Sequence, residues 1–241
     1  MQIIQNDKLS LFFGAKQHAF DPIVVRESGR ATEFFAQEPF LALKQQLQAD
    51  ALFVDYQVHG VDGVLLKKEA SALIPSPLTP MADFIVTDIP RLAVAVTTAD
   101  CVPVIIYHEL MGVVAAVHAG WRGSVNGIVR HAVEAMKTHF AVDSAGLRAF
   151  IGPCARACCY AVGAEVIEAL ATRPAFLSER STGVYCDLVA LNTTQLIEIG
   201  VPANAIDVRY ATCTICSTDW YSYRRDRTPL RQLSGIVIHE R

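Results

Sequence analysis

The stretch TTADCVPVIIYHELMGVVAAVHAGWRGS, residues 97–124, decides the fold because it holds two apolar runs separated by a short polar turn. The runs 102–107 and 112–118 are rich in Val, Ile and Ala and have the length of buried strands. Cys101 precedes the first run, and His118 ends the second, 17 residues later. One hairpin of adjacent strands spans that separation, so the thiol and the imidazole are expected at the same end of a sheet.

Patterns outward from this hairpin predict more strands, with helices on both sides of the central run. Because successive strands occupy the middle of the chain, the order favours an α+β layered domain over a doubly wound sheet. The tract 74–80 contains three prolines and predicts a surface loop within one domain. The other predicted strands cover 52–58, 84–87, 92–98, 147–152, 206–210 and 235–239. The predicted helices cover 124–136 with Ser124 as N-cap, 32–48 with an interruption near Pro39, 165–172, and 188–199.

Composition limits the class of protein. The chain has 241 residues, of which 52% are hydrophobic and 19% charged, and these values are typical of a folded soluble domain. A formal net charge of −3 offers no field for nucleic acid, and no apolar run reaches the length of a membrane span. Seven cysteines, without a signal peptide, indicate reduced thiols and a cytoplasmic location. We expect one domain over 1–241, acting as a monomer without nucleic-acid or membrane partners.

Several common sites are excluded by missing motifs. The sequence has no G-x-G-x-x-G after a strand, no G-x-x-x-x-G-K and no G-x-S-x-G, which disfavours dinucleotide binding, P-loop nucleotide binding and the common serine hydrolases. The seven histidines include no His-x-His pair, so the chain lacks the dense imidazole supply that several coppers require.

Three chemistry-bearing residues stand at predicted strand ends: His59 in DYQVHGVDG, Cys101 and His118. Imidazole and thiolate are zinc ligands, and a catalytic zinc takes three protein ligands and leaves one position open. Alternatively, Cys101 is a nucleophile with His118 as its base, which would make a metal-free hydrolase. An isolated histidine can also be a hydrogen-bonded core residue. Residue types alone leave these alternatives open.

The segment HAGWRGS adds a candidate anion site. Gly120 and Gly123 permit a tight turn and close backbone approach, and Arg122 supplies a cation beside the expected helix start at Ser124. Phosphate or carboxylate would suit such a site. The alternative is an arginine on a solvated loop.

Later cysteines and arginines give weaker signals. GPCARACCYAVG places Cys154, Cys158 and Cys159 near Tyr160, which could form a second metal site or a glycine-bounded turn that lines a pocket. Packing is favoured there because three thiols lack a fourth ligand for a closed zinc site. CTIC, residues 213–216, has zinc-ribbon spacing without a clear second pair. WYSYRRDR supplies Ser222, Arg224 and Arg225 for a pocket wall or a surface edge.

Five segments of the sequence, taken in chain order, resemble the YfiH family, also called the laccase-domain or multicopper polyphenol oxidoreductase family. They are QVHG, TADCVPV, HAGWRG, GPCARACCYAVG and CT…WYSYRRD. The resemblance is strongest over 52–241, whereas 1–50 diverges and lacks the S-L-N and N-R elements of the family. It implies a single-domain α/β/β/α sandwich with mixed sheets and zinc held by His59, Cys101 and His118. Copper is the less favoured metal.

The resemblance also implies activities. The leading one is a zinc-dependent purine nucleoside enzyme, which carries out phosphorolysis of adenosine, inosine or methylthioadenosine and deamination of adenosine. Asp100 is the candidate proton carrier, Arg122 the candidate phosphate site, and the other candidate substrate contacts are Gly123, Tyr160, Ser222 and Arg224. The alternatives are a Cys101/His118 amidase or peptidoglycan-precursor editing hydrolase, a laccase-like polyphenol oxidase, and a non-catalytic zinc-binding module.

Overall fold

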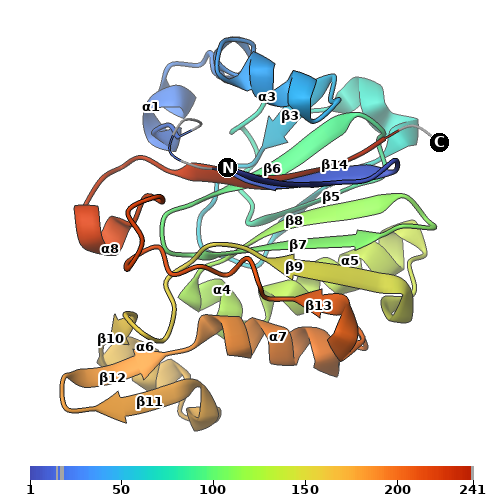
Figure 1. Cartoon of the computed structure of the whole chain (residues 1–241). Helices are drawn as coiled ribbons and strands as arrows, with labels where there is room; N and C mark the ends of the chain where they lie inside the picture. Colours follow the sequence, from blue (N-terminus) through green and yellow to red (C-terminus); the bar gives the residue numbers. More distant parts are fainter. Residues whose placement is uncertain (15, 17–18, 240–241) are drawn as a thin grey trace.

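The computed structural model describes residues 1–14, 16 and 19–239, and Figure 1 shows them stacked in four layers. Three short helices cover one face of a five-stranded sheet, and a six-stranded sheet packs against its other face. Longer helices then cover the outside of the second sheet. Both large sheets mix parallel and antiparallel pairs. The expected α/β/β/α sandwich with mixed sheets is therefore confirmed.

The strands form three sheets. In spatial order, the five-stranded sheet contains β1 (Gln2–Gln5), β2 (Leu9–Phe13), β14 (Gln232–Ile238), β6 (Leu92–Thr98) and β3 (Ala51–Val54). The six-stranded sheet contains β13 (Ile206–Asp207), β9 (Leu147–Ile151), β7 (Val102–His108), β8 (Val113–Ala119), β5 (Phe84–Thr87) and β4 (Gly63–Leu66). The small sheet contains β10 (Ala161–Val162), β12 (Gly183–Cys186) and β11 (Leu177–Arg180).

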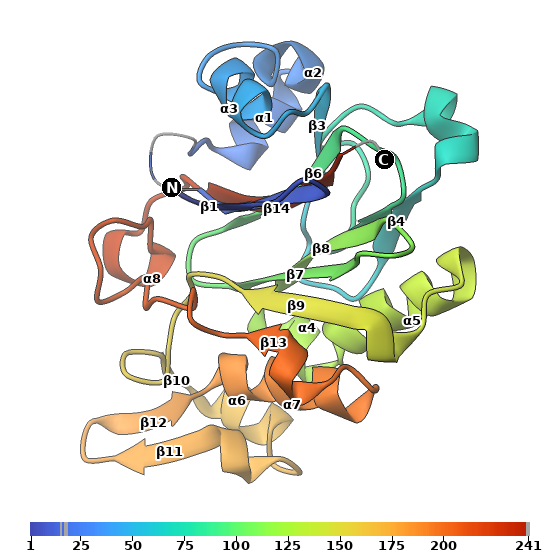
Figure 2. The ribbon, with the colours of Figure 1, turned by 45° about the vertical axis from the view of Figure 1, so that its right-hand side comes forward.

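The helices divide between the two outer faces. Above the five-stranded sheet lie α1 (Pro22–Glu27), α2 (Ala31–Phe34) and α3 (Phe40–Gln46), as Figure 2 shows. Below the six-stranded sheet lie α4 (Trp121–Val125), α5 (Ile128–Phe140) and α7 (Leu188–Glu198), while α6 (Ala164–Ala169) accompanies the small sheet. The short α8 (Tyr223–Asp226) flanks one end of the sandwich, and 3-10 turns cover Lys68–Leu73, Ser144–Gly146, Pro174–Phe176 and Ala203–Ala205.

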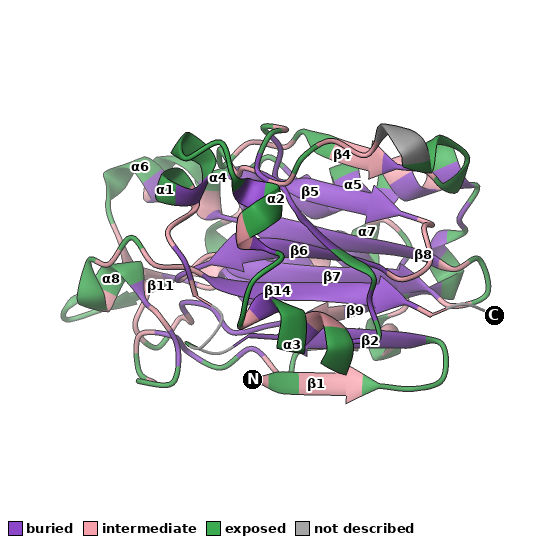
Figure 3. Ribbon diagram, turned by 90° about the horizontal axis from the view of Figure 1, so that it is seen from above, coloured by how far each residue is buried: buried purple, intermediate pink, exposed green. Residues whose placement is uncertain are grey.

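Three hydrophobic cores lie between the four layers, and neighbouring residues of one strand feed different cores. Phe12 packs under α1–α3, whereas Phe13 packs between the two sheets. Likewise Ile105 faces the core between the sheets, and Ile106 faces α5. Because both faces of the central strands are covered, β6, β7 and β8 are buried along their whole length (Figure 3). This explains their continuous apolar runs, which do not alternate with polar residues.

The predicted central elements lie close to the expected residues, but several boundaries were wrong. Strand β3 ends at Val54 instead of continuing to 58, because the following amides bond to a loop and to a carboxylate. Strand β13 ends at Asp207, whose carboxylate accepts the backbone N–H of Arg209 and turns the chain. Pattern reading did not predict β1, β2, β4 or the small sheet.

Ser124 is not the N-cap of the helix that follows the hairpin, which corrects the prediction. The helix begins at Trp121 with Gly120 as N-cap, ends at Val125, and restarts as α5 after Gly127. Gly127 adopts a left-handed φ of 80°, which breaks the helix into two pieces. Ser124 is instead buried inside α4, where its hydroxyl accepts the Asn192 side-chain N–H at 2.9 Å.

The proline-rich tract 74–80 forms no helix or strand, as predicted, although Leu78 within it is buried against the helical core. Among residues 1–14, 16 and 19–239, no helix has both the length and the apolar character that crossing a membrane requires.

Candidate metal centre

His59, Cys101 and His118 converge, as the sequence predicted, at one end of the β7–β8 hairpin. One ligand atom from each lies within 4.8 Å of the other two. The Cys101 Sγ is 3.8 Å from the His59 Nε2, and the two imidazole rings stand nearly perpendicular with centroids 4.8 Å apart. His118 is buried, Cys101 is half-buried and His59 is exposed, so the cluster opens toward solvent on the His59 side.

Strand register brings two of these residues together. Pro103 pairs with His118 and Val102 with Ala119, so Cys101, one residue before β7, lies beside the end of β8. His59 arrives on the loop after β3 with a left-handed φ of 63°, and Asp100 has a φ of 94°. Left-handed backbone at residues other than glycine is uncommon and concentrates at functional sites.

The buried carboxylate of Asp83, directly before β5, fixes this loop and His118 together. Its Oδ1 accepts the His118 Nδ1 at 2.8 Å and the His59 N–H at 2.8 Å. Its Oδ2 accepts the N–H of Gly60 at 2.6 Å and that of Val58 at 3.3 Å. With Nδ1 engaged, the free nitrogen of His118 is Nε2. Sequence reasoning missed Asp83, and the only signal was a carboxylate directly before an apolar strand.

Charge separates strongly within the cluster when no metal is bound. Burial raises the pKa of the Cys101 thiol, but the two imidazoles outweigh burial and lower that pKa to about 6. Burial lowers the pKa of His118, while the Cys101 thiolate and Asp83 outweigh burial and raise it to about 10. With no metal bound, these shifts favour a thiolate on Cys101 beside an imidazolium on His118. The two residues become a thiolate and an imidazole donor once the imidazolium proton is displaced.

The donor set fits a zinc ion with an open position. Two imidazoles and one thiolate gather, and no fourth His, Cys, Asp or Glu joins them within the described part of the chain. A carboxylate behind a ligating histidine is the usual support of such sites. Gly120 leaves the space, because a Cβ there would lie 2.9 Å from the His59 ring and 3.3 Å from the Cys101 Sγ.

The cluster forms the floor of a cleft of about 720 Å³. That volume falls in the range of small-molecule sites. Residues of three separate segments supply its aromatic and cationic walls, namely Trp121, Tyr160, Tyr223, Arg224, Arg227 and Arg231. Arg227 and Arg231 both lie against the Tyr223 ring, with guanidinium carbons 5.5 and 5.4 Å from its centroid. Sequence reasoning did not single out Trp121, Tyr223, Arg227 or Arg231.

The predicted catalytic pair separates in the structure. Asp100 lines the cleft, and both of its oxygens are engaged: Oδ1 accepts the Thr214 hydroxyl at 2.7 Å and Oδ2 the Arg224 N–H at 2.6 Å. Arg122 is not among the residues that line the cleft, because it pairs with Glu165 at 2.5 Å and covers the Trp121 ring.

Two of the predicted substrate contacts line the cleft, and two do not. Tyr160 and Arg224 line the cleft, and the Arg224 guanidinium carbon lies 5.5 Å from the centroid of the Tyr160 ring. Burial raises the pKa of the Tyr160 hydroxyl, which keeps it protonated. Ser222 is buried and caps α8 by accepting the Arg225 N–H at 3.1 Å. Gly123 is buried where a Cβ would lie 2.9 Å from the Gly60 carbonyl oxygen, so it packs α4 against the His59 loop.

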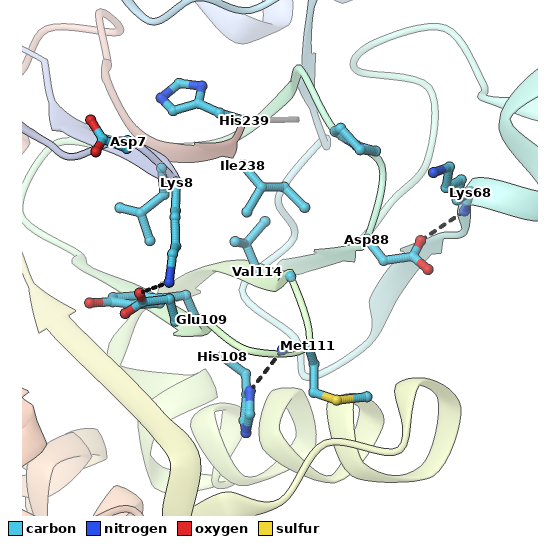
Figure 4. Close-up of a pocket in the computed structure, with 14 residues that line it drawn as sticks. Asp7, Lys8, Lys68, Asp88, His108, Glu109, Met111, Val114, Ile238 and His239 are labelled. Carbon is cyan, nitrogen blue, oxygen red and sulfur yellow. Dashed lines mark hydrogen bonds and ion pairs between the residues drawn. The ribbon is translucent and has the colours of Figure 1, made fainter. Parts of the chain in front are cut away.

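A second cleft, of about 780 Å³, lies at the opposite end of the same hairpin, where His108 pairs with Val113 (Figure 4). It contains none of the predicted site residues. Its charges are partly neutralised, since Lys8 pairs with Glu109 at 2.6 Å and Asp88 accepts the backbone N–H of Lys68 at 2.7 Å. Among the residues that the structure describes, no comparable cluster of metal donors lies in this cleft.

The remaining cysteines correct one prediction. CTIC has a second pair after all, because Cys158 and Cys159 meet Cys213 and Cys216 with all four sulfurs within 4.8 Å of one another. Cys154 is a packing residue, as expected, and is fully buried. The pairing was not visible from the sequence because more than fifty residues separate the two loops.

Comparisons with known proteins agree with this arrangement. The family described as multi-copper polyphenol oxidoreductase laccase matches residues 36–239. A purine nucleoside phosphorylase of Streptomyces coelicolor is 38% identical over 206 residues, covering 80% of this chain and 80% of that protein. Adenosine deaminase RL5, from an unknown prokaryotic organism, is 34% identical over 196 residues, covering 77% and 74%.

The fold has solved counterparts as well. The crystal structure of YlmD from Geobacillus stearothermophilus has a TM-score of 0.75 and 27% identity, covering 96% of this chain and 91% of that one. Sequence match, fold and ordered motifs thus coincide over most of the chain, including the segments that carry His59, Cys101 and His118. The chain belongs to the multi-copper polyphenol oxidoreductase laccase family, the YfiH family that its ordered motifs resemble.

Proposed function

We propose that the protein is a zinc-dependent purine nucleoside enzyme that carries out phosphorolysis of adenosine, inosine or methylthioadenosine and deamination of adenosine. The observation that carries the proposal is the donor cluster of His59, Cys101 and His118 at the floor of a cleft with aromatic and cationic walls. Relatives named purine nucleoside phosphorylase and adenosine deaminase support the substrate class.

Zinc is the metal that we propose for the cluster. One thiolate with two imidazoles suits zinc better than a multicopper centre, because only two histidines gather there among the described residues. Zinc bound there supplies Lewis acidity, by which enzymes make a water nucleophilic near neutral pH. The part of Asp83 is to hold the His118 Nδ1–H and fix the ring orientation.

The walls of the cleft suit a nucleoside and an anion. Tyr160, Trp121 and Tyr223 offer ring faces for a purine base. We assign the phosphate to Arg227 rather than to Arg122, because Arg227 lines the cleft and Arg122 pairs with Glu165 outside it. A guanidinium fork matches phosphate oxygens in pairs.

Asp100 has two candidate roles. Its hydrogen bonds to Thr214 and Arg224 make it a positioning residue that joins the two loops around the cleft. The alternative is proton transfer to the leaving amine in deamination. Replacement by Asn distinguishes them, because loss of a proton carrier removes a limb of the pH profile of kcat, whereas loss of positioning raises KM without changing that profile.

The experiment is incubation of the zinc-loaded full chain with adenosine, with and without phosphate, and separation of the products. Phosphorolysis gives adenine and ribose 1-phosphate only with phosphate present, whereas deamination gives inosine in either case. We expect both activities to fall with His59→Ala and phosphorolysis alone to fall with Arg227→Ala. Arg122→Ala is the matched control. Zinc-loaded protein that forms none of these products would sink the proposal.

The specific rival is a metal-free thiol amidase, including hydrolysis of peptidoglycan precursors, favoured by the low pKa of Cys101 beside His118. The two hypotheses predict different effects of a chelator and of iodoacetamide on activity. A zinc enzyme loses activity with a strong chelator and regains it with added zinc, whereas a thiol amidase is insensitive to the chelator and is inactivated by iodoacetamide.

Two other readings fit the site less well. A laccase-like oxidase would need more imidazole ligands than the two that gather in the described chain. A purely structural zinc module would need a closed set of four ligands, and this centre has three beside an open cleft.

A further inference from the structure

Two loops that are far apart in the sequence lie against each other beside the candidate metal centre. Residues 154–160 follow β9, and residues 211–217 precede α8. An isolated parallel β-bridge, formed by backbone hydrogen bonds, joins the loops at Cys154 and Cys213. The Cys154 N–H donates to the Thr212 carbonyl at 3.0 Å, and the Thr214 N–H donates to the Cys154 carbonyl at 2.9 Å. Each loop contributes two cysteines to one cluster.

The cluster has the dimensions of a single tetrahedral ion. With Zn–S bonds of about 2.3 Å, four sulfurs around zinc lie about 3.8 Å apart. The Sγ of Cys216 is 3.6 Å from that of Cys158 and 2.9 Å from that of Cys159, and no pair in the cluster exceeds 4.8 Å. Small shifts of exposed side chains would make these separations equal, since Cys158 and Cys216 are exposed.

Backbone turns at both ends aim the sulfurs inward. The Cys159 N–H donates to the Arg156 carbonyl at 2.9 Å, and the Ser217 N–H to the Cys213 carbonyl at 3.0 Å. The backbone N–H groups of Arg156 and Cys216 point at the Cys213 sulfur. Such N–H donors favour the thiolate form of Cys213.

Positive charge surrounds the cluster. Arg225 donates to the carbonyls of Thr214 and Ser217, both at 2.6 Å, and is attracted by Cys213. From the end of β11, Arg180 donates to the carbonyls of Ala157 and Cys158 in the 154–160 loop. Zinc with four thiolates carries a net negative charge, which Arg180 partly offsets, whereas the charge of Arg225 is shared with Asp226, its ion-pair partner at 2.6 Å.

We propose that Cys158, Cys159, Cys213 and Cys216 form a second metal site, a closed tetrathiolate zinc site that joins the 154–160 and 211–217 loops. Each thiol loses its proton to solvent on binding, so one Zn²⁺ replaces four protons. The site leaves no open position and is structural. It fixes the loops that carry Tyr160 and Thr214, and Thr214 holds the Asp100 carboxylate at the cleft.

The test uses the full chain, expressed with added zinc sulfate and purified under reducing conditions without chelator. We expect the wild type to retain one zinc more per chain than Cys216→Ser, and His59→Ala to retain the zinc that Cys216→Ser loses. Cys186→Ser is the matched control, because Cys186 is a free cysteine buried in the core away from the cluster. Equal zinc content in the wild type and Cys216→Ser would overturn the proposal.

X-ray absorption at the zinc edge keeps the test valid if Cys216→Ser folds poorly. In His59→Ala, the remaining zinc is expected to show a shell of sulfur alone at about 2.3 Å. In His59→Ala protein that holds one zinc per chain, a shell containing nitrogen or oxygen would contradict a tetrathiolate site.

A disulfide is the competing outcome, since Cys159 and Cys216 have the closest sulfurs. Alkylation with iodoacetamide in denaturant, after zinc removal and on protein purified without reductant, separates the two. The metal site predicts that all seven cysteines are modified. A peptide linked through Cys159 and Cys216 would reject it in favour of a disulfide.

Discussion

Replacing the buried Asp83 with Asn tests the most constrained part of the candidate metal centre. The carboxylate accepts hydrogen bonds from four donors, two on each oxygen: His118 and His59 on Oδ1, and Gly60 and Val58 on Oδ2. Asparagine keeps one acceptor oxygen and replaces the other with an NH₂ group. In either orientation, two donors then face N–H groups and lose their acceptor.

Each buried donor without a partner costs about 1–3 kcal/mol, so two cost about 2–6 kcal/mol. The Val58 contact is long, at 3.3 Å, and contributes least. We therefore expect the free energy of unfolding of Asp83→Asn to fall by about 2–4 kcal/mol. Loss of the carboxylate behind a ligating histidine also weakens metal binding by about 10- to 100-fold, which corresponds to about 1.4–2.7 kcal/mol.

Urea unfolding of the zinc-free protein measures the first quantity, and zinc competition with a chromogenic chelator measures the second. Asp88→Asn is the matched control, because Asp88 is on the same segment and bonds only the Lys68 backbone N–H through Oδ1. The reasoning is refuted if Asp83→Asn stays within about 0.5 kcal/mol of wild type in stability, the range of an ordinary surface substitution. Zinc affinity within twofold of wild type would be equally contrary.

Further predictions concern the same centre. In zinc-free protein, the thiolate of Cys101 should persist down to pH about 6, because its pKa is lowered to about 6. Its alkylation by iodoacetamide should therefore fall as pH falls through that value. Cys186 is the control, because burial raises its pKa to about 12 and it should not react at neutral pH. Gly120→Ala places a Cβ 2.9 Å from the His59 ring and should lower zinc affinity by about tenfold, a value of about 1.4 kcal/mol, in the same competition assay. Zinc at about 100 times its dissociation constant should stabilise the protein by about 2.7 kcal/mol, and calorimetry with and without chelator should show the lower Tm in the stripped protein. A Tm that does not change with zinc would contradict the binding of zinc to the folded protein in preference to the unfolded chain.

The central elements were predictable because their signals are local. The apolar runs around Val104 and Val117, and the helical spacing from Ile128 to Met136, belong to segments buried on one or both faces. The hairpin spacing between Cys101 and His118 therefore translated into a register that places them side by side. Edge elements such as β1 and the small sheet are short and partly exposed, so their patterns carried little information.

The candidate site was predictable only as far as its donors. Residue chemistry marks His59, Cys101 and His118 as possible zinc ligands. The resemblance of the ordered motifs to the YfiH family then favoured a metal site over a thiol–imidazole pair or core histidines. The exclusion of Arg122 from the cleft was not predictable, because its pairing with Glu165 joins residues from separate elements. The same holds for Asp100, whose partners Thr214 and Arg224 lie more than a hundred residues away.

By itself, the sequence predicted the layered fold and the hairpin from short-range periodicity. It predicted three candidate metal donors from residue chemistry together with the family resemblance of its motifs. Only the tertiary structure decided which polar groups support them. Tertiary packing brings Asp83 to His118, and it brings Cys158 and Cys159 to Cys213 and Cys216. No spacing rule in the sequence connects these segments. Burial makes the contacts of Asp83 necessary, because a carboxylate removed from water must find a hydrogen-bond donor or a counter-charge.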